Sequence, residues 1–224
     1  MTAVESCAGL GVGAIRLQRA GFDVVAANDI SKPLMEAYAK LHPGVEVVVG
    51  DIRHEPTLVA LHDAAPTAAV LAAGLSCQPF SSGGLTRGSG DDRSCSLPGI
   101  LRAALLLRKP ILILECVANA ATNRFVRCHL ETFCQQCGYG MSEVILKLED
   151  VWVSKRDRWW AVLVVTTLGV PNLRGFVPGP YPCVVKDVLP RPLPFSDDEI
   201  AQPQFSADER SRISHWHRRP LQIL

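Results

Sequence analysis

The sequence has no apolar run long enough to cross a membrane, and no signal-peptide pattern precedes its first apolar segment. Its net charge is only +1, so the overall balance does not indicate a nucleic-acid partner, although a local basic cleft would be compatible with it. Aromatic residues make up 6% of the chain, and we find no internal repeat. We therefore expect an intracellular protein that does not enter a membrane and is not a repeat array.

The eight cysteines include only one Cys-x-x-Cys pair, formed by Cys134 and Cys137. A structural zinc site needs four ligands, and no second pair of this kind occurs. We therefore expect no metal, although Cys128 and His129 lie nearby in the sequence. In a reducing compartment the cysteines are expected to be free thiols.

Short apolar runs alternate with helical patterns, and 48% of the 224 residues are hydrophobic, so the sequence predicts an α/β fold with a sizeable core. The predicted strands are 2–6, 22–28, 45–49, 68–73 and 111–114, with an antiparallel closing pair at 144–148 and 159–167. The predicted helices are 14–20, 31–41, 98–109 and 125–137. Nine of the sixteen prolines follow residue 170, so we divide the chain into a domain at 1–170 and a Pro-rich segment at 171–224.

A glycine-rich turn follows the first predicted strand and precedes a helix. It consists of Cys7, Ala8, Gly9, Leu10, Gly11, Val12 and Gly13. A strand, a glycine loop and a helix in this order are typical of sites that bind a phosphate or a nucleotide cofactor, because glycine lets the ligand approach the backbone. Many tight turns use glycine for packing alone, so this pattern by itself leaves both interpretations open.

An aspartate stands at the end of each of the next two predicted strands. Asp29 follows the second strand and is placed to accept hydrogen bonds from ribose hydroxyls. Asp51 follows the third strand, where a carboxylate could bind the exocyclic amine of an adenine. Each acid alone could equally cap a helix or lie in a solvated loop. Three ligand-type loops at three successive strand ends favour a nucleotide-like cofactor.

Groups that could perform chemistry follow the fourth and fifth strands. Cys77 lies just beyond the carboxyl end of a buried strand, where open α/β sheets bind ligands, although a free cysteine is often simply buried. Glu115 lies at the predicted tip of the fifth strand, and a structural ion pair with an arginine is the alternative role for it. Arg156 and Arg158 belong to a short basic stretch whose alternative interpretation is a solvated hairpin turn.

The order of these motifs, from the first strand to about Thr167, resembles that of the DNA (cytosine-5) methyltransferase family. The resemblance implies a Rossmann-like S-adenosylmethionine-dependent methyltransferase fold, with a mostly parallel central sheet and an antiparallel closing strand. The cofactor it implies is S-adenosyl-L-methionine. The residues that it assigns to cofactor binding are Cys7, Ala8, Gly9, Leu10, Gly11, Gly13, Asp29, Ile30, Asp51, Ile52 and Ser76.

The same resemblance assigns catalytic roles to Cys77, Glu115, Arg156 and Arg158. Cys77 would add to carbon 6 of a cytosine flipped out of DNA, and Glu115 would protonate ring nitrogen 3. An arginine of the pair would orient the base, and the methyl group would pass to carbon 5. Phosphate contacts are expected from basic residues around the cleft, with Arg87, Arg93 and Lys155 as candidates.

Four positions depart from the family's motifs. Cys7 replaces an aromatic residue, Ser76 a proline, Cys116 an asparagine and Ser154 a glutamine. Three alternatives therefore stay open: a relative that methylates a tRNA cytosine, a degenerate fragment that only binds cofactor or nucleic acid, and a small-molecule methyltransferase.

The family also has a long target-recognition region, followed by a late helix and a final motif. We do not find the last two, and residues 184–189 are a candidate for the start of the recognition region. We therefore expect a truncated chain with weak or absent turnover on its own. The resemblance implies a location in the nucleus for a eukaryotic protein and in the cytoplasm for a bacterial one.

Overall fold

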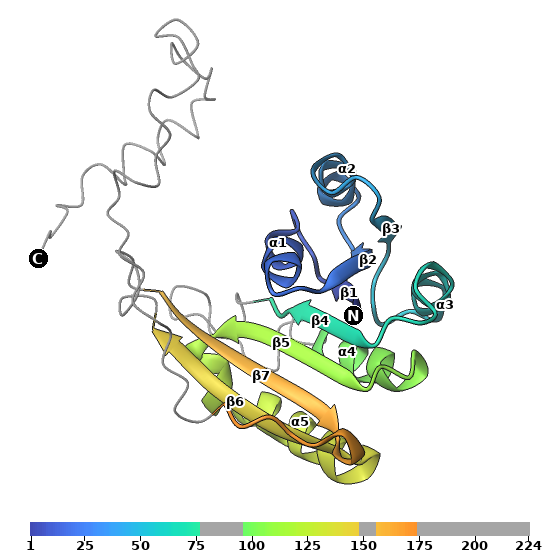
Figure 1. Cartoon of the computed structure of the whole chain (residues 1–224). Coiled ribbons are helices and arrows are strands. Elements are labelled where there is room, and N and C mark those ends of the chain that lie inside the picture. Colours follow the sequence, from blue (N-terminus) through green and yellow to red (C-terminus); the bar gives the residue numbers. More distant parts are fainter. Residues whose placement is uncertain (77–95, 148–155, 174–224) are drawn as a thin grey trace, which may run out of the picture. The chain divides into compact units, whose positions relative to one another are not determined.

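The computed structural model describes residues 1–76, 96–147 and 156–173 (Figure 1). Tertiary contacts divide the chain into two units, 1–180 and 181–224, and all of the described residues belong to the first. Cys77, Arg87, Arg93, Ser154, Lys155 and the stretch 184–189 lie outside the described residues.

A seven-stranded sheet forms the centre of this unit (Figure 1). Its strands are β1 (Thr2–Ser6), β2 (Asp23–Asp29), β3 (Glu46–Val49), β4 (Val70–Gly74), β5 (Ile111–Val117), β6 (Tyr139–Lys147) and β7 (Asp157–Val165). The spatial order is β3-β2-β1-β4-β5-β7-β6. The pairs among β1 to β5 are parallel, whereas β7 runs antiparallel to both β5 and β6. The prediction of a mostly parallel sheet with an antiparallel closing strand is confirmed.

Helices cover both faces of the sheet. They are α1 (Val12–Arg19), α2 (Lys32–Leu41), α3 (Glu55–Ala64), α4 (Ser96–Leu106) and α5 (Arg124–Cys137), with 3-10 turns η3 (Ala118–Thr122) and η5 (Thr166–Leu168). Side chains alternate between the faces along each strand, so Ala3 packs in the core beneath α1 and α2, whereas Val4 packs in the core shared with α3, α4 and α5. The sheet is therefore doubly wound (Figure 1).

The structure corrects the sequence prediction at three elements. Helix α3 was not predicted, although Pro56 in its first turn and the buried Leu58 and Leu61 are the signals of a short amphipathic helix. Glu115 lies within β5 rather than at its tip, because pairing with β7 continues the strand to Val117. Strands β6 and β7 begin earlier than predicted, and the 3-10 turn η5 follows β7 where strand had been expected.

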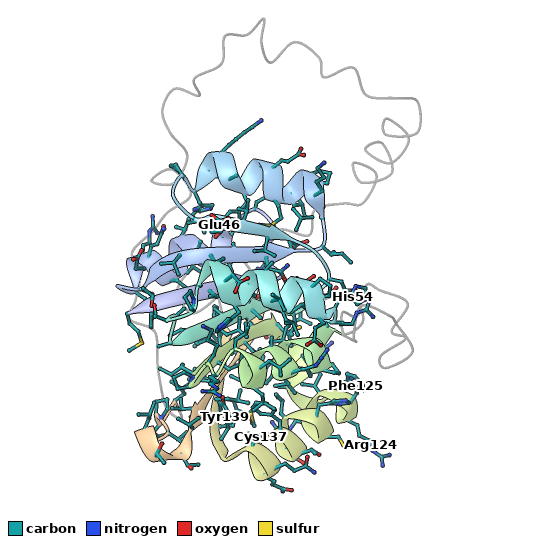
Figure 2. All side chains as sticks on the ribbon, turned by 90° about the vertical axis from the view of Figure 1, so that its right-hand side faces the viewer. Glu46, His54, Arg124, Phe125, Cys137 and Tyr139 are labelled. Carbon is teal, nitrogen blue, oxygen red and sulfur yellow. The ribbon has the colours of Figure 1, made fainter. Side chains whose placement is uncertain are left out.

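The parallel arrangement brings several loops to one edge of the sheet. Figure 2 shows His54, Arg124 and Phe125, at the starts of α3 and α5, toward one side, and Glu46 and Tyr139, at the starts of strands, away from it. The loops after β1 and β4 leave adjacent strands toward helices on opposite faces. In open α/β sheets this switch point is where ligands bind.

None of the helices in the described ranges is long and apolar enough to cross a membrane. Within the same ranges no group of His, Cys, Asp and Glu side chains is arranged to hold a metal ion, and Cys128, Cys134 and Cys137 are free thiols.

Candidate functional site

Two cavities open at the carboxyl edge of the sheet, one on each side of the switch point. The smaller, of about 400 Å³, is lined by both strand-end aspartates and residues beside them: Asp29, Ile30, Asp51, Ile52, Arg53 and Ser76. The larger, of about 530 Å³, is lined by the start of α1 and by β4, β5 and β7. Cys7 after β1 and Gly74 at the end of β4 line both, so they form the wall between the two cavities.

The glycine loop holds Asp29 in place through backbone hydrogen bonds. Gly9 N donates to Asp29 Oδ2 at 3.0 Å, and Ser31 N donates to Oδ1 at 2.9 Å. Gly9 has φ 56°, a conformation that glycine adopts readily, and its N–H is thereby turned toward the carboxylate. Each carboxylate oxygen has a second acceptor position, so Asp29 can still accept hydrogen bonds from a diol such as a ribose.

Asp51 carries a different partner. Its carboxylate is bound by the guanidinium of Arg53, with Nε 3.0 Å from Oδ1 and Nη2 2.6 Å from Oδ2. These hydrogen bonds are the main reason why the pKa of Asp51 lies below its usual value. The side chain of Asp51 is 11% exposed and that of Arg53 is 42% exposed. The acid is therefore fixed in the cavity lining, whereas the arginine can move in solvent.

Asn28, which the sequence analysis did not single out, ties the ends of three strands together. Its side chain accepts from Ser6 Oγ at 3.1 Å and donates to the carbonyls of Val48 and Gly50 at 3.0 and 2.9 Å. The amide therefore fixes the end of β3, and with it the position of Asp51. An asparagine inside an otherwise apolar strand was the available sequence signal, because a buried amide must find partners.

A second buried polar group, also not singled out from the sequence, lies behind the glycine loop. Tyr38 Oη donates to Glu5 Oε2 at 3.0 Å, and the Tyr38 ring lies 4.4 Å from that of His42, whose Nε2 is 3.3 Å from the Leu10 carbonyl oxygen. A Cβ at Gly11 would collide with the His42 ring. Helix α2 therefore supports the loop from behind through these contacts.

The cysteine of the glycine loop does not have the properties of a nucleophile. Burial, aided by the negative charge of Asp29, raises the pKa of Cys7 to about 11. The thiol is thus protonated at neutral pH, and only a thiolate attacks efficiently. Cys7 is a lining residue of both cavities, in line with its predicted place beside a cofactor.

The larger cavity contains an ion pair formed by two of the predicted catalytic residues. Arg158 Nε lies 2.8 Å from Glu115 Oε1, and the two side chains are 22% and 19% exposed, respectively. The residues come from adjacent strands, β7 and β5. Glu115 pairs in register with Gly74 at the end of β4, so this pair lies at the strand end that leads to Cys77. Arg156 lines the same cavity.

The predicted cofactor residues fall into three groups. Asp29, Ile30, Asp51, Ile52 and Ser76 line the smaller cavity, Ala8 and Gly13 line the larger, and Cys7 lines both. Gly9, Leu10 and Gly11 line neither, and their contribution is the backbone path of the loop between the cavities.

The smaller cavity fits the adenosine part of S-adenosylmethionine. It combines two fixed carboxylates, which can accept hydrogen bonds from hydroxyl and amine groups, with the apolar side chains of Ile30 and Ile52. Ile30 is 67% exposed, so its apolar surface is available to a planar ring. This mixture of a few polar groups and apolar surface is typical of cofactor sites.

Residues 1–178 match the family described as C-5 cytosine-specific DNA methylase. The chain is 33% identical over 164 residues to the Type II methyltransferase M.NlaX of Neisseria lactamica, which covers 68% of this chain and 49% of that protein. It is 30% identical over 156 residues to the Type II methyltransferase M.NgoMIV of Neisseria gonorrhoeae, covering 69% and 48%. The chain thus spans about half the length of these relatives.

Solved structures show the same fold. The crystal structure of the Dnmt2 methyltransferase of S. pombe superimposes with a TM-score of 0.57 at 21% identity, covering 74% of this chain and 49% of the other. A DNMT2 variant of Spodoptera frugiperda gives a TM-score of 0.61 at 19% identity, covering 80% and 56%. The fold is thus that of a methyltransferase, and with the sequence match over most of its length the chain belongs to the C-5 cytosine-specific DNA methylase family.

Proposed function

We propose that this chain carries the cofactor-binding and catalytic region of an enzyme that methylates carbon 5 of cytosine in DNA, with S-adenosylmethionine as the methyl donor. The observation that carries the proposal is the position of the Glu115–Arg158 ion pair. It lies in a cavity that shares the Cys7 and Gly74 wall with the acid-lined cavity. The family membership of residues 1–178 supports the same conclusion.

In this proposal the smaller cavity binds the adenosine group. Asp29 accepts hydrogen bonds from the ribose hydroxyls, Asp51 accepts one from the adenine amine, and Ile30 and Ile52 contact the ring. When bound, S-adenosylmethionine supplies an electrophilic methyl group on a sulfonium.

Cytosine needs activation because its carbon 5 is a weak nucleophile. The Cys77 thiolate forms a bond to carbon 6, and the electron pair of the ring double bond moves toward carbon 5 and ring nitrogen 3. Glu115 supplies a proton to nitrogen 3 and so relieves the negative charge that develops there. After carbon 5 is methylated, its proton leaves to a base, the carbon 6 bond breaks and Cys77 is released.

Arg158 has two possible acceptors in the proposed complex. Its guanidinium donates to Glu115 in the structure, and a cytosine in the larger cavity would offer the ring carbonyl oxygen as well. Arg156 lines the same cavity and can take over one of these contacts. A guanidinium has five N–H donors in a plane, so a single arginine can hold a carboxylate and a carbonyl oxygen together.

The cytosine must leave the base stack to enter such a cavity, because its carbon 6 is not accessible inside a duplex. The same chemistry applies to an RNA cytosine, so the substrate test includes both nucleic acids. Contacts with phosphates would make binding weaken as the salt concentration rises.

The test uses methyl-labelled S-adenosylmethionine with duplex DNA or tRNA, and a second duplex in which 5-fluorocytosine replaces cytosine. The fluorine cannot leave as a proton does, so a nucleophilic cysteine stays bonded to carbon 6. We expect a DNA adduct from the parent chain and none from Cys77→Ser, since a hydroxyl is far less ionised than a thiol. Cys128→Ser, at an exposed cysteine on α5, is the matched control and should still form the adduct.

Two results would contradict the proposal. An adduct that survives Cys77→Ser would mean that another residue is the nucleophile. Labelling or adduct formation with tRNA alone would identify the substrate as RNA. Cofactor binding without any adduct, even at high substrate concentration, would favour the non-catalytic alternative.

A further inference from the structure

The adenine end of the smaller cavity contains an internal competitor. Asp51 Oδ1 accepts from the backbone N–H and Nε of Arg53 at 2.9 and 3.0 Å, and Oδ2 accepts from Nε and Nη2 at 2.9 and 2.6 Å. A carboxylate oxygen has about two acceptor positions, so Arg53 uses those of both oxygens. A ligand amine can therefore bind Asp51 only if the guanidinium gives up at least one of these positions.

The backbone of Arg53 is held while its side chain is free to turn in solvent. Arg102 on α4 donates from Nη1 to the Arg53 carbonyl oxygen at 3.3 Å and forms an ion pair with Glu55 at the start of α3. The side chain of Arg53 is 42% exposed, against 11% for Asp51. The guanidinium can thus swing away from Asp51 without any change in the loop.

Asp51 and Arg53 also have opposite hydrogen-bonding character. An ionised carboxylate only accepts, and a guanidinium only donates. The 6-position of a purine is a donor in adenine, where it is an amine, and an acceptor in hypoxanthine, where it is a carbonyl. Asp51 is complementary to the first and repels the second, whereas Arg53 is complementary to the second.

We propose that Arg53 sets the selectivity of the cofactor cavity at the purine 6-position, by competing with the adenine amine for Asp51 and by offering a donor to a 6-carbonyl. This inference rests on the proposed function, because it requires the smaller cavity to bind adenosine. Arg53 lowers the affinity for the amine and makes the cavity tolerate the carbonyl. Removal of its guanidinium leaves the carboxylate alone at the 6-position.

The test measures the dissociation constants of S-adenosylhomocysteine and S-inosylhomocysteine by calorimetry. These ligands differ at the purine 6-position. For Arg53→Ala we expect the preference for the amine over the carbonyl to rise on the order of tenfold above that of the parent, the scale of one charged hydrogen bond. Arg19→Ala removes an exposed arginine of α1 that lines neither cavity, and it should leave the preference unchanged.

Asp51→Asn separates this inference from the proposed function. An asparagine can donate or accept, so the preference should fall toward equality in this variant. If S-adenosylhomocysteine binds and Asp51→Asn reduces the preference, but Arg53→Ala leaves it within twofold of the parent, the role of Arg53 is wrong and the cofactor site stands. If neither ligand binds the folded parent, the cofactor assignment fails and the inference fails with it.

Discussion

Replacement of Glu5 by glutamine should make the protein more stable above neutral pH. Glu5 is 5% exposed in β1, and burial raises its pKa from the ordinary 4.5 to about 7. Hydrogen bonds from Tyr38 and the Ala14 backbone, and the charge of Arg16, oppose this effect without cancelling it. The folded protein therefore holds a proton on this carboxyl at pH values where the unfolded chain has released it.

The sign of the pH dependence follows from this difference. Between pH 4.5 and about 7 the folded state binds more protons than the unfolded state, so the free energy of unfolding falls as the pH rises through this window. At ~1.36 kcal/mol per pH unit, the loss reaches about 3 kcal/mol above pH 7. Glutamine has the shape of the protonated acid and does not ionise. We therefore expect Glu5→Gln to match the parent near pH 4.5 and to exceed it by up to about 3 kcal/mol at pH 8.

Urea unfolding at several pH values between 4.5 and 8 measures this directly. Trp159 is buried and donates to Glu143, so its fluorescence reports the loss of packing around β7. Glu36→Gln, at a carboxylate of α2 with 63% side-chain exposure, is the matched control and should run parallel to the parent. Parallel curves for Glu5→Gln and the parent across the whole window would refute the reasoning, because Glu5 would then have the same pKa in both states.

Three further outcomes follow from the site. Asp29→Ala should weaken S-adenosylhomocysteine binding in calorimetry by on the order of tenfold or more, because the ribose acceptors are lost; unchanged affinity would remove Asp29 from the site. Glu115→Gln should slow formation of the 5-fluorocytosine adduct in a gel time course by on the order of a hundredfold, the scale of a general acid. Asn28→Ala should lower the free energy of unfolding by about 2 kcal/mol, since the carbonyls of Val48 and Gly50 lose their donors, and urea unfolding would show a smaller change if water replaces the amide.

The sequence was sufficient to predict the sheet because the strands are buried and their ends are marked. Continuous apolar runs define β1, β2, β4 and β5, and a glycine or an aspartate follows most of them. In a parallel sheet the ends of such runs meet at one edge, so the acids could be predicted to lie together. Helix α3 escaped because its apolar face is short and contains only Thr57, Leu58 and Leu61.

Contacts between distant residues could not be predicted in the same way. Glu115 and Arg158 form their ion pair because β7 enters the sheet next to β5 in antiparallel register, and no local pattern specifies that neighbour. The contacts of Tyr38 and His42 with the glycine loop depend on how α2 packs against β1 and β2. Helical periodicity predicts that one face of α2 is buried but does not say which polar groups it meets. These residues were visible in the sequence only as polar side chains within apolar patterns.

The two cavities share a wall because the strand order reverses at this point. β1 and β4 are neighbours, but β1 leads to α1 on one face of the sheet and α4 lies on the other. The wall is thin because Gly74 has no side chain, and a Cβ there would lie 3.7 Å from the Cys7 carbonyl oxygen and 3.9 Å from Glu115 Oε2. These are ordinary contact distances, so the space beside Gly74 is open without being strained. In the proposed complex, a donor held by the two aspartates would thus be separated from Glu115 mainly by backbone, which a methyl transfer between the cavities requires.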